Sequence, residues 1–504
     1  MKYLKFIALY ILMIPLASSA QKIIYSEPER DDARSMDFDI IGKVSGNFLV
    51  YKGIRSNHII AVYDNDLKLK EKHNMSFLPD KLVDADFISY PTYSYMIYEH
   101  QKRGVLHCMA VKLDSIGNKV GEPKELDTTS IGILSDNKIY TVAYSEDKQK
   151  IMVFKIQKKG DKFYYTTLLF NQQLELMKKS RMLLTYDERK NALSDFIVDN
   201  EGNFVFAIGR KATLKDYLTD ISLIIKAPDT DTFNINDISI KKLYLDELQV
   251  KADNIHKRYL INSFYYTRKR GDIEGLFSCI WDKEQNKQIV ESAIEFNDTL
   301  KAEARTDGPL RTAFNNFFIR NIISKRDGGY IIAGEDFNSY SRTNPWNRQD
   351  YLYGSPYSSA YDYYTPSYYN YRYRNYYNSS SYQQTRYYYN NIVVFNLDKD
   401  GTLQWSNVIH KNQYDDDTDD FLSYELFNTG SQLHFLFNEK ERKNQMLSDR
   451  SLEPSGEILR NPTLKSLDKG YEFMPRLAKQ VSSRQIIVPC YYRNYICFAK
   501  IDYL

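Results

Sequence analysis

A dense group of potential metal ligands lies at residues 415–420, which are five aspartates interrupted only by Thr418. Calcium takes six to eight hard oxygen ligands, and carboxylates supply them. The run lacks the D-x-D-x-D-G spacing of a defined calcium loop, so a solvated acidic run is favoured over a metal site. We expect no cofactor, and Asp415, Asp417 and Asp419 are the candidate ligands if calcium binds.

Two cysteines near the C-terminus could form a disulfide. Cys490 and Cys497 flank the Arg-Asn dipeptide 493–494, and a two-residue hairpin turn there would place them directly opposite each other. This register makes them a hydrogen-bonded cross-strand pair, which is a less favourable geometry for a disulfide. The alternative is two buried small apolar side chains. For Cys108 and Cys279 the sequence suggests no partner.

The sequence contains no familiar catalytic signature. It has no G-x-S-x-G, H-E-x-x-H, glycine-rich phosphate loop or C-x-x-C pattern, and its seven histidines are dispersed. Nothing in it positively indicates an enzyme. A glycoside hydrolase needs only two suitably spaced carboxylates, which sequence alone does not locate. A carbohydrate-active hydrolase with carboxylates near a central axis is therefore the alternative function.

The first twenty residues predict a secretory signal peptide. Lys2 and Lys5 precede an apolar run over 6–16, and the small residues 18–20 suit cleavage before Gln21. No cysteine follows the apolar run, so a lipoprotein is not expected. No later stretch is long and apolar enough to span a bilayer. We expect an exported protein, either periplasmic or extracellular.

The composition of the chain is that of a globular protein. Of 504 residues, 43% are hydrophobic and 26% are charged, which excludes a wholly disordered or collagen-like chain. The formal net charge of +3 is too small to indicate a nucleic-acid partner. Tyrosine is unusually abundant, with 44 residues.

Short aromatic and β-branched runs recur along the chain, roughly every fifty to sixty residues outside a low-complexity insert. They are found at 48–52, 95–100, 151–156, 204–209, 259–266, 330–336, 433–437 and 486–492. A second strand and an acidic or amide turn follow each run, as in LDKDG at 397–401. Repeats of this length with short strands are typical of propeller blades.

We therefore predict an all-β fold, a single eight-bladed β-propeller over residues 21–504, with seven blades as the alternative. The last copy lacks its outer strand, and KIIYS at 22–26 would supply that strand and close the ring. The segments GGYIIAGEDF and NNIVVFNLDKDGTLQWSNVIHK resemble repeats of secreted β-propeller proteins of the Bacteroidota type. This resemblance implies a fold and an envelope location, and it carries no catalytic residues.

Residues 340–389 interrupt the sixth repeat with a low-complexity segment that contains 17 tyrosines, five arginines and no lysine. Few aliphatic residues are present, so we expect a disordered insertion within blade six. It is either an adhesive arm or a loop expansion without function. The candidate contact residues are Tyr363, Tyr364, Tyr368, Arg372 and Arg374.

Basic residues cluster where the second and third strands of the repeats connect. The candidate binding residues are Arg210, Lys211, Arg268, Lys269 and Arg270. In a propeller these connections share one face, so their charges would add up to a positive field. Acidic loops between repeats would share this face, which makes the field mixed.

These features predict a non-catalytic binding scaffold in the bacterial cell envelope. It would use its loop face and the tyrosine-rich arm, because a rigid ring displays many loops without changing its core. The expected partner is an envelope protein or an anionic polysaccharide. A further alternative is a structural component of a secretion or adhesion assembly.

Overall fold

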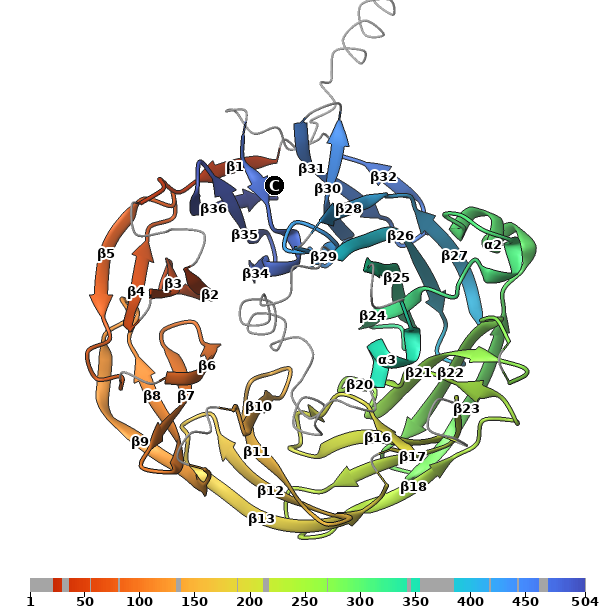
Figure 1. Cartoon of the computed structure of the whole chain (residues 1–504), viewed down its shortest axis with the longest axis horizontal. Helices are drawn as coiled ribbons and strands as arrows, with labels where there is room; N and C mark the ends of the chain where they lie inside the picture. The colour runs from red at the N-terminus through yellow and green to blue at the C-terminus, as the bar shows by residue number, and fades with distance from the viewer. Residues whose placement is uncertain are drawn as a thin grey trace, which may run out of the picture.

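The computed structural model describes residues 21–29, 36–54, 56–79, 82–132, 137–187, 189–211, 217–269, 271–341, 346–353, 385–416, 418–441, 444–461 and 470–503. Antiparallel sheets dominate these residues and are arranged radially in a ring (Figure 1). Such an arrangement is a β-propeller, so the predicted all-β propeller fold is confirmed. None of the helices among the described residues has the length and hydropathy that a membrane span requires.

Four sheets are simple four-stranded meanders, in which consecutive strands pair. The first consists of β2 (Asp37–Val44), β3 (Asn47–Ile54), β4 (Asn57–Tyr63) and β5 (Leu69–Asn74). The next two contain β6 (Leu82–Ser89), β7 (Ser94–Lys102), β8 (Val105–Leu113) and β9 (Lys119–Ser130), and then β10 (Tyr140–Tyr144), β11 (Lys150–Lys159), β12 (Lys162–Asn171) and β13 (Leu176–Thr185). The fourth contains β29 (Tyr424–Asn428), β30 (Leu433–Glu441), β31 (Asn444–Leu452) and β32 (Ile458–Arg460).

A sheet of ten strands lies between these sheets, and it consists of two joined meanders. It contains β14 (Asn191–Leu193), β15 (Ile197–Val198), β16 (Phe204–Lys211), β17 (Leu218–Lys226) and β18 (Asn234–Ile238). It continues with β19 (Tyr244–Leu245), β20 (Gln249–Asp253), β21 (Arg258–Tyr266), β22 (Gly275–Asp282) and β23 (Lys287–Glu295). The two-residue strand β19 is the link, because Leu245 pairs with both Leu218 and Tyr265.

The remaining two sheets lie in the C-terminal part of the ring. One contains β24 (Phe317–Ser324), β25 (Tyr330–Ser341), β26 (Thr385–Leu397) and β27 (Leu403–Ile409), with β28 (Gln413–Asp416) paired to β26. The other contains β33 (Glu472–Phe473), β34 (Lys479–Ser482), β35 (Gln485–Tyr492), β36 (Tyr495–Asp502) and the N-terminal strand β1 (Lys22–Tyr25).

The N-terminal strand pairs with the C-terminal one. β1 runs antiparallel to β36, with Lys22 opposite Asp502 and Tyr25 opposite Ala499. Ser26 extends the ladder, because its backbone N–H donates to the Phe498 carbonyl at 2.8 Å. The first and last segments of the described chain thus lie in one sheet.

The eight aromatic runs found in the sequence are all second strands of their meanders: β3, β7, β11, β16, β21, β25, β30 and β35. A second strand is paired on both edges and packed on both faces, which explains its continuous apolar character. Neighbouring sheets pack face to face, as where Phe48 and Val50 of β3 meet Ile487 and Phe498 of the last sheet. The core is therefore divided among the spaces between sheets.

The predicted turn chemistry is present. In the β26–β27 turn, the Asp398 carboxylate accepts hydrogen bonds from the backbone N–H groups of Asp400 and Thr402 at 3.0 and 2.9 Å, and Gly401 has φ +73°. Asp114 makes the same two bonds in the β8–β9 turn, beside Gly117 at φ +84°. This repetition supports the repeat assignment.

Helical segments are few and short: α2 (Asp298–Ala304), α3 (Arg348–Tyr353) and the 3-10 turns η1 (Leu310–Thr312) and η3 (Pro475–Leu477). Asn297 caps α2, since its side chain accepts the Leu300 N–H at 2.8 Å. α2 and η1 lengthen the connection between β23 and β24, which accounts for the long interval between the fifth and sixth aromatic runs.

The ends of the tyrosine-rich segment are ordered, so the prediction of disorder over all of 340–389 is wrong for these ends. β25 continues to Ser341, β26 begins at Thr385, and α3 lies between them. Trp346 and Tyr351 pack on Phe337, with ring centroids 5.1 and 4.9 Å away, and Tyr389 is buried beside them. Aromatic side chains thus replace the missing aliphatic ones. Residues 342–345 and 354–384 lie outside the described part.

Candidate functional site: the hairpin face

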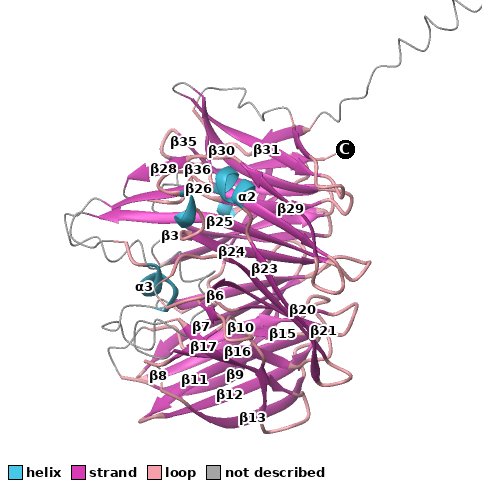
Figure 2. Cartoon of the chain, turned by 90° about the vertical axis from the view of Figure 1, so that its right-hand side faces the viewer, coloured by secondary structure: helices cyan, strands magenta, loops and turns pink. Residues whose placement is uncertain are grey.

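The connections between second and third strands lie on one side of the ring. In a four-stranded meander this side also carries the links between sheets, and the other turns lie on the opposite side. α3 belongs to the β25–β26 connection and marks this side, which Figure 2 shows at the left. We call it the hairpin face, and the opposite side the turn face.

Exposed cations from five sheets lie at the tips of the hairpin face. They are Lys102, Arg103, Lys158, Lys159, Lys162, Arg268, Lys269, Lys440 and Arg493. The predicted cationic tips are therefore exposed in the β7–β8, β11–β12, β21–β22, β30–β31 and β35–β36 connections. Hairpin turns place these side chains in solvent, because the two paired strands end there.

The predicted basic residues differ in exposure and pairing. Arg268 and Lys269 are exposed after β21, whereas Arg270 lies outside the described residues. Arg210 is exposed but forms an ion pair with Asp220 at 2.8 Å. Lys211 is buried, contrary to the expectation of an exposed tip, because the β16–β17 register shifts between Arg210 and Lys211 and turns the lysine inward. Burial lowers the pKa of Lys211.

The predicted contact residues of the tyrosine-rich segment, Tyr363, Tyr364, Tyr368, Arg372 and Arg374, lie outside the described residues. The root of the segment is firmly attached. Arg348 of α3 donates to the buried Asp246 carboxylate at 2.5 Å, and the Tyr266 hydroxyl donates to the same carboxylate at 2.8 Å. The segment therefore leaves the ring from a fixed position on the hairpin face.

The acidic run is divided between separate ion pairs. Asp416 forms two hydrogen bonds with the Arg386 guanidinium, at 2.6 and 2.9 Å. Asp419 is buried and accepts from Arg476 at 2.7 Å and from the Tyr389 hydroxyl at 2.8 Å. Asp415 lies in β28, and Asp417 is outside the described residues. Among the described residues, no group of three or more His, Cys, Asp or Glu could hold a metal ion.

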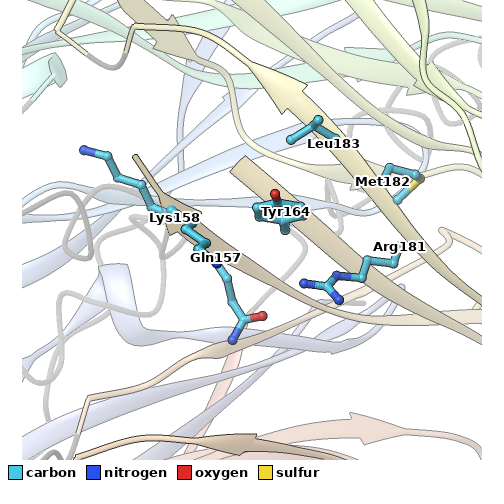
Figure 3. A pocket seen from close by; sticks show the side chains of 7 residues that line it. Gln157, Lys158, Tyr164, Arg181, Met182 and Leu183 are labelled. Atoms are coloured by element: carbon cyan, nitrogen blue, oxygen red, sulfur yellow. The ribbon is translucent and has the colours of Figure 1, made fainter. Parts of the chain in front are cut away.

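A hollow of about 620 Å³ lies at the hairpin-face end of β11, β12 and β13. We call it the β11–β13 hollow, and it is lined by Gln157, Lys158, Lys159, Tyr164, Arg181, Met182 and Leu183. Figure 3 shows the Tyr164 ring with Gln157 and Lys158 on one side and Arg181 on the other. The Arg181 guanidinium is 5.0 Å from the centroid of this ring. Leu183 is 48% exposed and adds an apolar rim.

The cations of this hollow differ from their neighbours in how they are paired. Lys155 and Lys179 both contact the Asp127 carboxylate, at 2.6 and 2.8 Å. In the part of the chain that the structure describes, Lys159 and Arg181 have no carboxylate partner. Lys159 and Arg181 therefore place positive charge beside an aromatic ring, which favours an anionic ligand.

Two buried glutamates occupy equivalent positions in different sheets. Glu99 is the sixth residue of β7 and Glu335 is the sixth residue of β25. Each lies beside a lysine from the link that follows its sheet, since Lys138 contacts Asp84 and Asp86 next to Glu99, and Lys411 contacts Glu335. These groups join neighbouring sheets through buried charge.

The carboxylates around Lys138 are the described group most similar to the predicted hydrolase pair. Asp86 and Glu99 are 8% and 4% exposed, and Glu99 accepts the backbone N–H groups of Ile139 and Tyr140 at 3.1 Å each. These hydrogen bonds hold the start of β10 against β7. Burial and, after it, the charge of Asp84 raise the pKa of Glu99 to about 8.

The raised pKa predicts that the protein loses stability as pH rises. The folded state holds the Glu99 proton more tightly than the unfolded state, so this contribution is complete below the unfolded pKa and is lost as pH rises through about 8. We expect Glu99→Gln to flatten the dependence of unfolding free energy on pH. The difference in unfolding free energy between the variant and the wild type should change by about 2 kcal/mol between pH 6 and pH 9.

Urea unfolding at a series of pH values measures this difference. Glu122→Gln is the matched control, because Glu122 in β9 of the same sheet is 86% exposed and should leave the wild-type curve unchanged. Parallel curves for wild type and Glu99→Gln would show that Glu99 does not carry the proton.

Cys490 and Cys497 lie opposite each other, as the hairpin register predicts, across a turn in which Arg493 and Asn494 have φ +46° and +72°. The structure holds both as free, buried thiols and not as a disulfide. In this structure the two cysteines are buried small side chains, which is the alternative that the sequence left open. Burial raises the pKa of the Cys490 thiol well above its usual value.

Several residues that the structure brings together could not be identified from the sequence. Tyr164 and Arg181 lie on different strands, and no local pattern connects them. The two glutamates had a visible signal, because each directly follows the apolar part of an aromatic run, in YMIYE and in YIIAGE. Their lysine partners are in loops of different length, so no fixed spacing identifies them.

No protein-family model matches this chain, and no curated protein matches it. Among solved structures, the polysaccharide lyase Uly1 has 12% identity and a TM-score of 0.38, over 83% of this chain and 89% of that one. The β-propeller domain of the trilobed protease from Pyrococcus furiosus has 9% identity and a TM-score of 0.36, and the match covers 88% of this chain and 99% of that one. Prolyl oligopeptidase B from Galerina marginata has 8% identity and a TM-score of 0.39, and the match covers 97% of this chain and 58% of that one.

Proposed function

We propose that this protein is an exported binding scaffold of the bacterial cell envelope and that its hairpin face holds an anionic partner. The observation that carries the proposal is the gathering of exposed lysines and arginines from five sheets on that face. Buried carboxylates such as Asp246, Glu335 and Asp419 already have cationic partners, so they act as structural ion pairs in this proposal. The signal-like residues 1–20 support export.

The tyrosine-rich segment extends the proposed surface. Its root at α3 lies on the hairpin face and is held by Arg348 and Asp246. Tyrosine and arginine together favour stacking and cation–π contacts with a partner. In this proposal the segment adds contacts beside the cationic tips, and the ring supplies a rigid base.

We also infer that the ring has eight blades. The ten-stranded sheet contains two meanders with their own second strands, β16 and β21, and among the described residues β19 is the strand that links them. Counting them separately gives eight modules, and seven blades would require counting that sheet once. β1 then supplies the outer strand of the last blade, through its pairing with β36.

Retention on immobilised dextran sulfate tests the proposed function. We expect the wild type to bind in low salt, and a variant with Lys102, Lys159 and Lys269 each changed to Gln to bind about tenfold more weakly, because these tips supply the positive field. The matched control changes Lys68, Lys287 and Lys399 to Gln. It removes the same charge from the turn face and should be retained like the wild type.

Equal weakening of both variants would contradict a role for the hairpin face, since net charge alone would then explain binding. Lack of wild-type retention at low salt would contradict an anionic partner. Melting curves of all three proteins confirm that the exposed substitutions leave the fold intact.

A further inference from the structure

Resting on the proposed function, we propose that the β11–β13 hollow is a subsite for an anionic polysaccharide that bears carboxylate or sulfate groups. The inference narrows the hairpin face to one place and names the chemistry of its ligand.

The charge of the hollow selects for an anion. Its seven lining residues include Lys158, Lys159 and Arg181 and no carboxylate. Asp127 contacts the neighbouring Lys155 and Lys179, and among the described residues neither Lys159 nor Arg181 has a carboxylate partner. Arg181 presents a planar fork that suits carboxylate and sulfate groups.

The aromatic ring gives the hollow a flat apolar floor. Tyr164 is half-buried near the hairpin end of β12, and the Arg181 guanidinium lies 5.0 Å from the centroid of its ring. The C–H face of a sugar ring packs well on such a surface, while its hydroxyl groups stay in water or bind polar side chains. The Gln157 amide supplies both a donor and an acceptor for these hydroxyls.

The arrangement of these groups favours a charged sugar chain over an isolated phosphate. Figure 3 shows Gln157 and Arg181 on opposite sides of Tyr164. Lys159, two residues beyond Gln157 in β11, lies on the same face of the sheet as Tyr164 and Arg181. A polysaccharide with a negative group on each unit places anions on both sides of a stacked sugar, whereas an isolated phosphate satisfies one side only. The volume of about 620 Å³ is within the range of small-ligand sites, and the hollow is open to solvent as a chain ligand requires.

Isothermal titration with defined oligomers tests this inference. The probes are a heparin hexasaccharide, a hexamer of galacturonate, a neutral dextran hexamer and a hexamer of glutamate. We expect the two anionic sugars to bind and the neutral sugar to bind at least tenfold more weakly. Arg181→Gln should weaken the anionic sugars about tenfold, and Tyr164→Ala should weaken them about fivefold.

The control variant is Arg484→Gln, because Arg484 is an exposed arginine in the β34–β35 turn and its replacement therefore removes the same charge from the turn face. It should bind like the wild type. Arg181 is exposed, so its variant carries the test even if Tyr164→Ala loses stability. Binding of hexaglutamate that equals the sugars and is insensitive to Tyr164→Ala would overturn the polysaccharide assignment.

The outcomes also separate this inference from the proposed function. If anionic sugars bind equally to wild type and Arg181→Gln, the subsite is wrong, while retention on dextran sulfate through other tips leaves the scaffold intact. If the wild type is not retained on dextran sulfate either, both fail.

Discussion

Replacement of Lys411 by methionine is expected to lower the free energy of unfolding by about 3–5 kcal/mol, although methionine fills nearly the same space. The Lys411 side chain has no solvent exposure, and its Nζ lies 2.7 Å from Glu335 Oε1. It also donates to the Tyr389 carbonyl at 3.0 Å and to Gln413 Oε1 at 2.9 Å. Burial lowers the pKa of Lys411, and Glu335 opposes that effect.

The loss arises because the variant leaves the equally buried Glu335 without its nearest cation. Ser423 at 2.7 Å and Arg320 at 3.5 Å are its other partners, and they connect β25 to the neighbouring sheet and to β24. Removal of one member of a buried ion pair costs far more than removal of both. The double variant Lys411→Met/Glu335→Leu should therefore recover most of the lost stability.

Denaturant unfolding of the single and double variants measures this difference. Lys399→Met is the control, because Lys399 is exposed in a turn of the same sheet and should change stability by less than about 0.5 kcal/mol. If Lys411→Met is as stable as this control, the buried pair does not hold these sheets together.

Removal of residues 21–26 is expected to destabilise the ring by about 5 kcal/mol and to cause self-association. Four residue pairs between β1 and β36 would be lost, together with the Ser26–Phe498 hydrogen bonds. The Tyr25 ring, which stacks on Tyr471 at 4.4 Å between centroids, would also be lost. The free edge of β36 would then be available to other strands.

Thermal unfolding and size-exclusion chromatography of the truncated protein check this expectation. A peptide with the sequence QKIIYS should restore the melting temperature in proportion to its concentration, because it binds only the folded ring. Lys22→Ser keeps the backbone pairs of β1 and is the matched control. An unchanged melting temperature after truncation would show that β1 does not latch the ring.

The repeats and their turns could be predicted from the sequence because they depend on local chemistry. Each second strand is buried on both faces, so its apolar run is continuous and easy to find in the sequence. Turns such as the one at Asp398 need one acceptor side chain and one residue with positive φ, and four consecutive residues provide both. The N-terminal strand was also found locally, as a β-rich segment left over at the start of the repeats.

The placement of residues that depend on contacts between sheets could not be predicted from local sequence. Lys211 was assigned to the surface with Arg210, and a one-residue register shift buries it. The ends of the tyrosine-rich segment looked too poor in aliphatic residues to fold, yet Trp346 and Tyr351 pack on Phe318 and Phe337 of a sheet already in place.

The sequence by itself determined the strand-forming repeats, the turns and the cationic character of the connections, since each is a property of a few adjacent residues. Only the tertiary structure decided which charges are free and which are paired. Lys155 and Lys159 belong to the same strand. Lys155 forms an ion pair with Asp127 of the neighbouring sheet, whereas Lys159 lines the hollow and has no carboxylate partner among the described residues. Electrostatic partners meet through space, and in a ring of sheets most of them are far apart in the chain.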